Sequence, residues 1–588
     1  MQLHRITQGK EASKEYQPGL SDQDRGKDLK AFLLLAVVSF TGIFLFCSFF
    51  GAYEDDYSET LSYFGFQRPE LLSTLQSYLL APPQGRPVGW ALNALLASVL
   101  GHQHNLEYSY LVGWLILTFN ACLLFLLLKK CLSRNAAIVG ALFLLLLPFD
   151  LAKAILMHRV FVYGSMTFLL LGLNLLSSDS KWLRRLSYPV AYLTLLTWEG
   201  CYLPFLFAPL LFFEKSKRWL IRAIVHVGIW GAMLGITLLI RYLTGENRIV
   251  ALAGGGQEMI MQMLSAMLIG PLAVVRATVT RPFETVLHAE PSSLLIGGLT
   301  AGAILYYLIV SKGESAVPRD RLLSPRIVAV LGAGIAAVLS PYVLMYRPGY
   351  FPPNVTIGRL SAEHVPAEFG YCVVVACIYF FFAEDLLKRF GLTVKAVFAL
   401  FFGCLMAFSL HIQKADYVEG WLDQRLIWTQ IAALIPDVND GIHVIVDLDG
   451  VPGSQMFSQL WLCGAADHAL RLLFKFPQEW KTQPDLIGFA SWSEHEKTTD
   501  SVTLKEPSWA PASWPVLRSG NFILLREKDG ELQRIDEPVD LFGVKLTPIT
   551  RHPAPALSLT SLGQHLLRAK SSQDWPGLRD ELPYPISK

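Results

Sequence analysis

The chain has 588 residues, of which 52% are hydrophobic and only 17% are charged, and its formal net charge is +2. Soluble domains carry about a quarter charged residues, so this composition excludes an ordinary water-soluble protein. The near-neutral balance and the lack of a basic arm argue against nucleic acid as a partner.

Apolar runs of the length that crosses a bilayer, about 17–25 residues, recur along the chain. Full-length runs lie near residues 31–50, 108–128, 219–241, 292–311, 326–346, 366–384 and 392–411. Shorter or proline-interrupted runs lie near residues 135–150, 160–177, 186–199 and 201–213. The fold class that they predict is mainly α, a polytopic bundle of about eleven transmembrane helices.

The N-terminal tail, residues 1–30, is too long for the n-region of an ordinary signal peptide, so we expect the first apolar helix to be retained. Clusters of Lys and Arg in alternate loops mark the cytoplasmic side. The main clusters are Lys129, Lys130 and Arg134; Lys181, Arg184 and Arg185; Lys215, Lys217, Arg218 and Arg222; Lys312, Arg319, Arg321 and Arg326; and Lys388 and Arg389. This alternation predicts a cytoplasmic N-terminus, an outer loop after the first helix and an exported C-terminal segment.

Two stretches complicate the count of helices. Residues 186–213 are too long for one span, and we expect two short helices that meet at Glu199, at or below the outer membrane surface. An ionisable side chain at that depth is a functional candidate by default. Residues 259–279 are interrupted by Pro271, and we expect a re-entrant or interfacial helix there.

Residues 412–588 differ in character from the membrane region, residues 31–411, and we expect them to form an exported, mixed α/β domain. "HVIVDLDG" is typical of a strand that ends in a turn, and "GNFILLREKDGELQRI" of a hairpin around Asp529-Gly530. For Asp447 and Asp449 in the first motif, a strand ending is favoured over a metal site.

The stretch "YEDDY" follows the first apolar run and opens a long outer loop, residues 51–107. Its three consecutive carboxylates, Glu54, Asp55 and Asp56, would lie at the lipid–water boundary. A solvated helix end is the simple interpretation; a reaction site at the depth of a lipid phosphate is the alternative. The same loop holds "GRPVGWALNALLASVLG", in which Arg86 and Pro87 begin an amphipathic helix that can lie along the interface.

This layout resembles the GT-C superfamily of membrane glycosyltransferases, through Asp55-Asp56 after the first helix, "GRPVGW" in the loop, many spans and a C-terminal domain. The resemblance implies transfer of a sugar from a polyprenyl-phosphate carrier to a glycan, lipid or protein acceptor, with inversion. It implies Asp55 or Asp56 as general base, while the neighbouring carboxylate orients the acceptor or a divalent cation, Mg²⁺ or Mn²⁺. Metal dependence stays open. It also implies a cell-envelope enzyme on the outer face of a bacterial inner membrane.

A leaving phosphate needs cations, and the arginine fork can grip two of its oxygens. Charged side chains on the predicted outer face are therefore candidates for substrate binding: Glu54, Arg86, His158, Arg159, Glu199, Arg347 and Arg359, with Lys153 and Arg241 beside them. For each of the cations, the alternative is a side chain that anchors the chain at the membrane interface.

Two other functions stay open. One is a transporter or flippase of a lipid-linked saccharide, which should carry charged residues through the membrane toward both sides. The chain has no Walker A motif, which argues against ATP-driven transport by this chain alone. The other is a non-catalytic membrane scaffold whose exported domain binds a partner.

Overall fold

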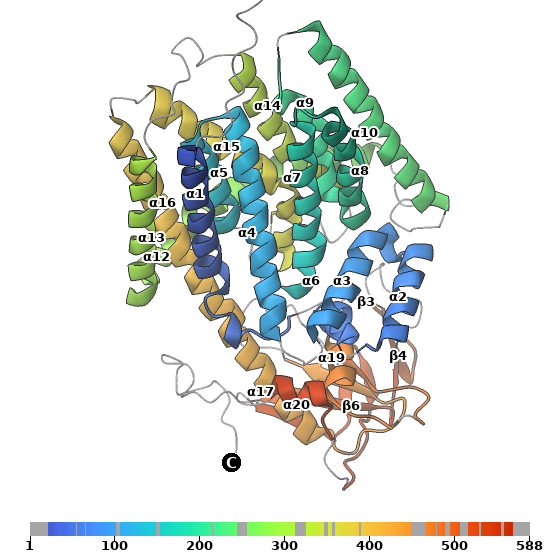
Figure 1. Cartoon of the computed structure of the whole chain (residues 1–588). Helices are drawn as coiled ribbons and strands as arrows, with labels where there is room; N and C mark the ends of the chain where they lie inside the picture. The colour runs from blue at the N-terminus through green and yellow to red at the C-terminus, as the bar shows by residue number, and fades with distance from the viewer. Residues whose placement is uncertain are drawn as a thin grey trace, which may run out of the picture.

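The structure of the protein is a computed structural model. It describes residues 22–53, 56–64, 66–101, 106–148, 153, 155–214, 216–243, 256–311, 325–345, 351–354, 359–386, 390–448, 465–477, 479–488, 494–505, 515–528, 531–553 and 558–567. Within these ranges the protein is a helical bundle, and its strands gather in a smaller C-terminal domain at one end (Figure 1).

Nine helices in the described ranges are long and apolar enough to cross a membrane. They are Gly26–Phe49, Leu106–Cys131, Leu156–Leu176, Lys217–Leu243, Gln257–His288, Pro291–Val310, Pro325–Leu344, Ser361–Glu384 and Gly391–Leu434. Shorter apolar helices are Pro87–Leu100, Arg134–Leu146 and Glu199–Leu211. By length and composition the chain is a multi-pass membrane protein, as the sequence predicts. The count of about eleven crossings stays a prediction.

The bundle combines regular α-helices with short 3₁₀ and π segments. The α-helices are α1 (Asp22–Ser39), α2 (Arg68–Leu80), α3 (Pro87–Leu100), α4 (Leu106–Cys131), α5 (Arg134–Leu146), α6 (Leu156–His158), α7 (Gly164–Leu176), α8 (Lys181–Thr197), α9 (Ala208–Leu211), α10 (Lys217–Leu243), α12 (Gln257–His288), α13 (Pro291–Val310), α14 (Pro325–Leu339), α15 (Glu368–Phe381), α16 (Gly391–Ile412) and α17 (Glu419–Leu434). The short segments include η1 (Phe40–Phe44), η3 (Asp56–Thr60), η5 (Pro83–Gly85), η8 (Arg159–Tyr163), η9 (Glu199–Phe207), η11 (Ser340–Leu344), η12 (Arg359–Ala367), η13 (Phe382–Leu386) and η15 (Gln413–Val418).

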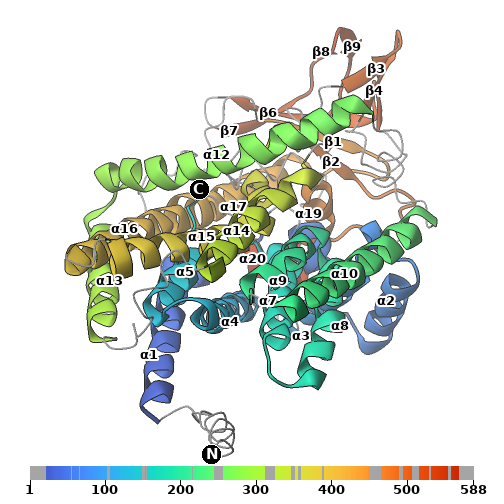
Figure 2. The same ribbon diagram turned by 90° about the horizontal axis from the view of Figure 1, so that it is seen from above.

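The centre of the bundle is α5, in which every residue from Ala136 to Leu146 is buried between α4 and α15. The outer helices have the opposite character, because α10, α12 and α13 expose many large apolar side chains. Figure 2 shows α12 along one side of the bundle, beside α16. Exposed apolar helices around a buried apolar centre fit a bundle surrounded by lipid.

Three stretches show how the helices break or continue. Between α8 and η9 the chain is extended at Trp198 (φ −156°, ψ 112°), so two short helices meet beside Glu199. In contrast, α12 is one unbroken 32-residue helix that passes through Pro271. Of the two forms expected for residues 259–279, the re-entrant one is therefore wrong. Likewise α16, η15 and α17 form a continuous helix that carries the chain past residue 411 to Leu434.

The C-terminal domain is built on a four-stranded mixed sheet of order β2-β1-β6-β7. In it β1 (His443–Asp447) runs parallel to β2 (Asp485–Gly488) and β6 (Phe522–Lys528), and β7 (Glu531–Ile535) returns antiparallel to β6. The strand and hairpin expected from the two sequence motifs are therefore present. Smaller sheets are formed by β3 (Glu494–Lys497), β4 (Ser501–Lys505) and β5 (Val516–Arg518), and by β8 (Val539–Leu541) and β9 (Val544–Leu546).

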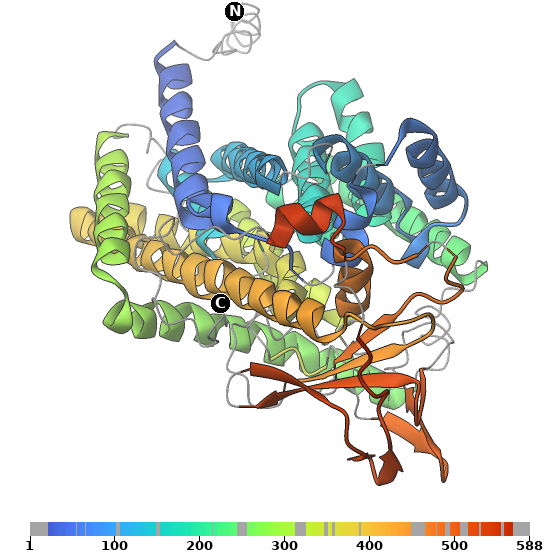
Figure 3. The same cartoon turned by 90° about the horizontal axis from the view of Figure 1, so that it is seen from below.

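The C-terminal domain packs against the bundle through specific contacts. Arg534 is buried and its Nη1 donates to Asp437 Oδ1 at 2.5 Å, just after α17. The backbone N–H of Leu532 donates to Gln430 Oε1 of α17 at 2.8 Å. Helix α19 (Ala465–Leu473) contacts η3, next to α20 (Ser561–Leu567) (Figure 3). We call this end of the bundle, which also carries the loop after α1, the domain end.

Candidate functional site

Asp56 is the described member of the acidic stretch, and it is buried rather than solvated. It begins η3, and its Oδ1 accepts the backbone N–H of Met157 at 2.9 Å while its Oδ2 accepts the N–H of Tyr53 at 3.2 Å. The carboxylate thus joins the loop after α1 to the first turn of α6. Burial raises the pKa of Asp56 to about 7, against the lowering effect of the Met157 N–H and the Arg159 charge.

Arg159 lies in η8, two residues after the N–H that Asp56 accepts, and only 2% of it is exposed. Its Nη1 donates to the Ser109 carbonyl at 2.6 Å and its Nε to the Ile155 carbonyl at 3.3 Å. The guanidinium lies over the Tyr110 ring, 4.3 Å from its centroid, as in a cation–π contact. Arg159 is therefore a buried cation beside Asp56, and it does not snorkel at the membrane surface.

A small gap between backbones makes room for Arg159. A Cβ on Gly113 of α4 would lie 2.0 Å from Arg159 Cδ, so a larger residue would displace the arginine. Beside the guanidinium is a cavity of about 20 Å³ that is lined by η3, α3, α4, α6 and η8, with Thr60, Asn93 and Ser109 as polar members.

Arg86 and Glu199, both predicted site residues, meet in the structure. Arg86 immediately precedes α3, and its Nε and Nη2 donate to Glu199 Oε2 at 2.9 Å and Oε1 at 2.7 Å, a bidentate pair. Arg241, in the last turn of α10, lies 3.6 Å from the same carboxylate and donates to the Gly85 carbonyl at 3.0 Å. Two guanidinium groups therefore lie against one carboxylate.

Helix α3 connects the two charged centres. Its N-terminus carries Arg86, and seven residues later Asn93 donates to the carbonyl of Glu59 in η3. At 1.5 Å per residue these two positions are roughly 10 Å apart along the helix. Trp90 of α3 packs edge-on against Phe161 of η8, with ring centroids 5.0 Å apart. Both centres therefore share one wall.

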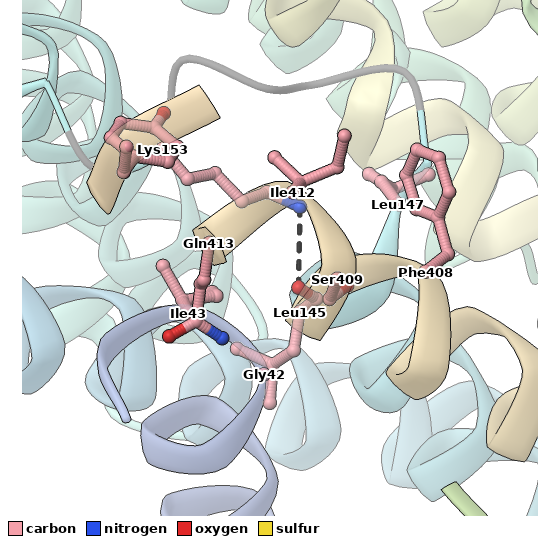
Figure 4. A pocket seen from close by; sticks show the side chains of 10 residues that line it. Gly42, Ile43, Leu145, Leu147, Lys153, Phe408, Ser409, Ile412 and Gln413 are labelled. Carbon is pink, nitrogen blue, oxygen red and sulfur yellow. Dashed lines mark hydrogen bonds between the residues drawn. The ribbon is translucent and has the colours of Figure 1, made fainter. Parts of the chain in front are cut away.

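Lys153 forms hydrogen bonds with backbone carbonyls that the sequence does not predict. It is buried, and its Nζ donates to the carbonyls of Leu144 and Leu145 at 3.1 and 3.3 Å, at the C-terminal end of α5. A cation there is stabilised by the partial negative charge of the helix end. The side chain also borders a cavity of about 30 Å³ beside Gln413 and Ser409 (Figure 4), room for about one water molecule.

Sequence reasoning missed a set of buried polar groups at the start of α15. Glu368 has no exposed surface, and Tyr163 of η8 donates to its Oε1 at 3.4 Å. Nearby His364 Nδ1 and the Tyr342 hydroxyl lie 2.8 Å apart. The signal was present in "SAEHVPAE", where two glutamates and a histidine open an apolar helix.

The remaining predicted residues have different outcomes. His158 ends α6 and is partly buried. Glu54, Asp55 and Arg347 lie outside the described residues, and Arg359 begins η12 with a side chain that is also outside them. Asp447 pairs with Arg526 Nε at 2.8 Å, consistent with an ordinary strand ending.

Within the described ranges there is no group of three or more His, Cys, Asp or Glu side chains arranged to hold a metal ion. Both oxygens of Asp56 accept backbone N–H groups, so this carboxylate is arranged as a helix cap. The comparisons with known proteins add no relative, because no protein-family model and no curated protein matches the sequence.

Proposed function

We propose that the protein is a membrane glycosyltransferase of the GT-C kind, which moves a sugar from a polyprenyl-phosphate carrier to an acceptor hydroxyl. The observation that carries the proposal is a buried carboxylate, Asp56, with a buried guanidinium, Arg159, close enough to affect its charge, at the domain end of an apolar bundle. Such a pair supplies a proton acceptor and a cation beside each other, next to lipid.

The proposed reaction is a single displacement. The acceptor oxygen attacks the anomeric carbon as the bond from that carbon to the phosphate oxygen breaks, and Asp56 takes the hydroxyl proton. The polyprenyl phosphate leaves as an anion, and the configuration at the anomeric carbon inverts. A carboxylate whose pKa is about 7 accepts a proton more readily than an ordinary aspartate does. Asp55, the adjacent acid, remains the alternative base.

Arg159 would stabilise the charge that grows on the leaving phosphate. A fixed cation in a site with little water stabilises such charge far more than a cation in solution does. Its contacts with Tyr110 and the Ser109 carbonyl hold the guanidinium in place. Arg86, one of the two arginines that contact Glu199, is a second candidate for binding the phosphate.

A transporter remains the rival, and the distribution of charge argues against it. The stretch of α15 from Phe369 to Phe381 contains no charged residue, and neither do residues 108–128 of α4. A transported saccharide would need polar groups along such segments, whereas the described charges collect at the two ends of the bundle.

The proposal includes an orientation. The basic loops would face the cytoplasm, and the domain end, with residues 412–588, would lie outside a bacterial inner membrane. Reporter fusions at Lys312 and Lys588 should then read inside and outside. A cytoplasmic reading at Lys588 would overturn this orientation.

The activity test uses purified full-length protein in phospholipid vesicles with a panel of sugar-labelled polyprenyl phosphates. We expect label to leave the lipid for an acceptor with release of polyprenyl phosphate. If no donor of the panel loses its sugar to any glycan, lipid or peptide acceptor, the proposal fails.

A further inference from the structure

The cavity beside Arg159 is small in this structure. Its volume of about 20 Å³ accommodates no more than a water molecule, and a phosphate group is larger. Any lipid phosphate that reaches Arg159 must therefore displace one of the cavity walls. One whole wall belongs to α3, through Asn93, Leu96, Ala97 and Leu100.

The helix pair α2–α3, which we call the hairpin, combines one helix without buried residues, α2, with one helix, α3, that buries six residues in the bundle. Every residue of α2 is exposed or partly exposed, and Leu72, Leu79 and Leu80 are more than half exposed. Figure 1 shows the hairpin at the side of the bundle, beside the C-terminal domain. Helices with few buried contacts open at a low free-energy cost, so α2 can follow a movement of α3 at little cost.

The cavity lies behind a surface of exposed apolar side chains. Leu95 and Val99 of α3 are 40% and 63% exposed, and Leu111 and Leu115 of α4 are 45% and 51% exposed. The two helices contact each other with the cavity between them. Separation of α3 from α4 would join the cavity to the apolar surroundings of these leucines.

One charged contact, the latch, ties the hairpin to the rest of the bundle. It consists of Arg86 from the hairpin, Glu199 from η9 and Arg241 from α10. Gly85 adds to the latch: its φ is +65°, and a Cβ there would lie 2.5 Å from Arg241 Nε. Arg86 and Arg241 side chains are 11% and 6% exposed, so the contact is nearly dry.

We propose that the hairpin is a lateral gate that opens between α3 and α4 to admit the phosphate end of a polyprenyl-phosphate lipid from the bilayer to Arg159. The lipid phosphate exchanges with Glu199 for the guanidinium of Arg86, which releases the latch. A ligand shifts a conformational equilibrium only if it binds one state better, and this exchange gives the phosphate such a preference. The identity of the lipid rests on the proposed function.

The experiment measures the distance between spin labels at Leu95→Cys on α3 and Leu111→Cys on α4, in the full-length protein in phospholipid vesicles. The labelled chain without the two new cysteines gives the background from native cysteines. With phospholipid alone we expect one short distance. Polyprenyl phosphate should add a second population at a longer distance.

Glu199→Gln should populate the longer distance without added lipid, because it removes the charge that holds Arg86. Glu214→Gln is the matched control, since Glu214 also pairs with an arginine, Arg222, at 2.7 Å, but in an exposed contact remote from the hairpin. It should leave the distance unchanged. The comparison with and without polyprenyl phosphate needs no change at Glu199, so it decides even if Glu199→Gln does not fold.

Two results would overturn the gate: a distance that polyprenyl phosphate leaves unchanged, or an equal opening by inorganic phosphate or by phospholipid alone. The outcomes also separate the two proposals. Opening without sugar transfer would support the gate and contradict the transferase proposal. Sugar transfer with an unchanged distance would support the transferase proposal and contradict the gate.

Discussion

The two ends of the bundle are built differently. At the end opposite the C-terminal domain, regular α-helices close with ion pairs between their side chains: Asp28 accepts from Lys129 at 2.5 Å and lies 3.2 Å from the buried Arg134. At the domain end the helices give way to the short segments η3, η8, η9, η11, η12 and η15, and the charged groups are buried among them. Among the residues that the structure describes, the opposite end has one comparable segment, η13.

The difference shows that irregular backbone makes N–H and carbonyl groups available to bind charged side chains. An α-helix uses its own N–H and carbonyl groups, whereas π and 3₁₀ segments leave some of them for side chains, often at functional sites. Asp56 accepts two backbone N–H groups and Arg159 donates to two carbonyls. Buried charges need such partners, so the irregular backbone and the candidate site occur together.

The largest effect on the function of the domain end is expected when the charge of Asp56 is removed. Asp56→Asn keeps the shape but cannot accept a proton at neutral pH, and we expect sugar transfer to fall about 10²–10⁴-fold. The initial rate of label transfer measures it. Glu59→Gln, in the same short helix, is the control and should keep most of the activity.

Because Asp56 also caps α6, the thermal unfolding of both variants must be measured. If a folded Asp56→Asn protein transferred sugar at the wild-type rate, Asp56 would not be the general base.

The pH dependence should follow the raised pKa of Asp56, about 7. Below pH 7 the base is protonated, so kcat/KM should fall about tenfold per pH unit, to roughly 100-fold at pH 5. Stability should change in the opposite direction. The folded pKa lies above the ordinary value of 3.8, so the contribution of this group to folding is complete below about pH 4 and is lost as the pH rises through 7.

Rates and unfolding measured across pH 4–9 test both halves of this prediction. A flat rate profile between pH 5 and 8 would contradict the role of Asp56 as the base.

Gly113→Ala should separate Arg159 from the site without changing any charge. Its Cβ would overlap Arg159 Cδ, and overpacking of this kind costs about 1–3 kcal/mol of stability. We expect the KM for the lipid donor to rise about tenfold, equivalent to about 1.4 kcal/mol. Gly231→Ala on α10 is the control, because a Cβ there meets nothing within 4 Å. An unchanged KM would show that Arg159 does not bind the donor.

The smallest effect is expected at the opposite end. Ser133 caps α5 by accepting the Ala136 N–H at 3.1 Å and donates to Glu384 at 2.6 Å. Ser133→Ala should cost about 1 kcal/mol of stability, a typical loss for an N-cap, and leave the rate of transfer unchanged. Denaturant unfolding and the transfer assay measure the two quantities. A large loss of activity would mean that the two ends are coupled.

The sequence predicts the membrane region well because hydrophobic length is a local property. Apolar runs predict most of the long helices, and the polar break at Glu199 predicts the two short helices that meet there. Pro271 suggests a break in the helix, whereas α12 continues through this proline as one helix. Neighbouring helices can satisfy the carbonyl that a proline frees, and a single sequence does not show those neighbours.

The candidate site is predicted less completely, because its geometry depends on contacts between distant segments. Position in the chain identifies Asp56, Arg86, Arg159 and Glu199 as candidates, but not the pairing of Arg86 with Glu199. The packing of Arg159 over Gly113 joins residues 46 positions apart and leaves no local pattern. Glu368 was missed because its acidic neighbours look like a solvated helix start.

The central claim is that sugar leaves its lipid at this protein. The direct measurement follows a polyprenyl phosphate labelled in both sugar and lipid, in sealed vesicles that contain the purified protein. We predict that sugar label moves to the acceptor while free polyprenyl phosphate appears in equal amount. If both labels stay on one molecule that only changes leaflet, the protein is a flippase and the transferase proposal is wrong.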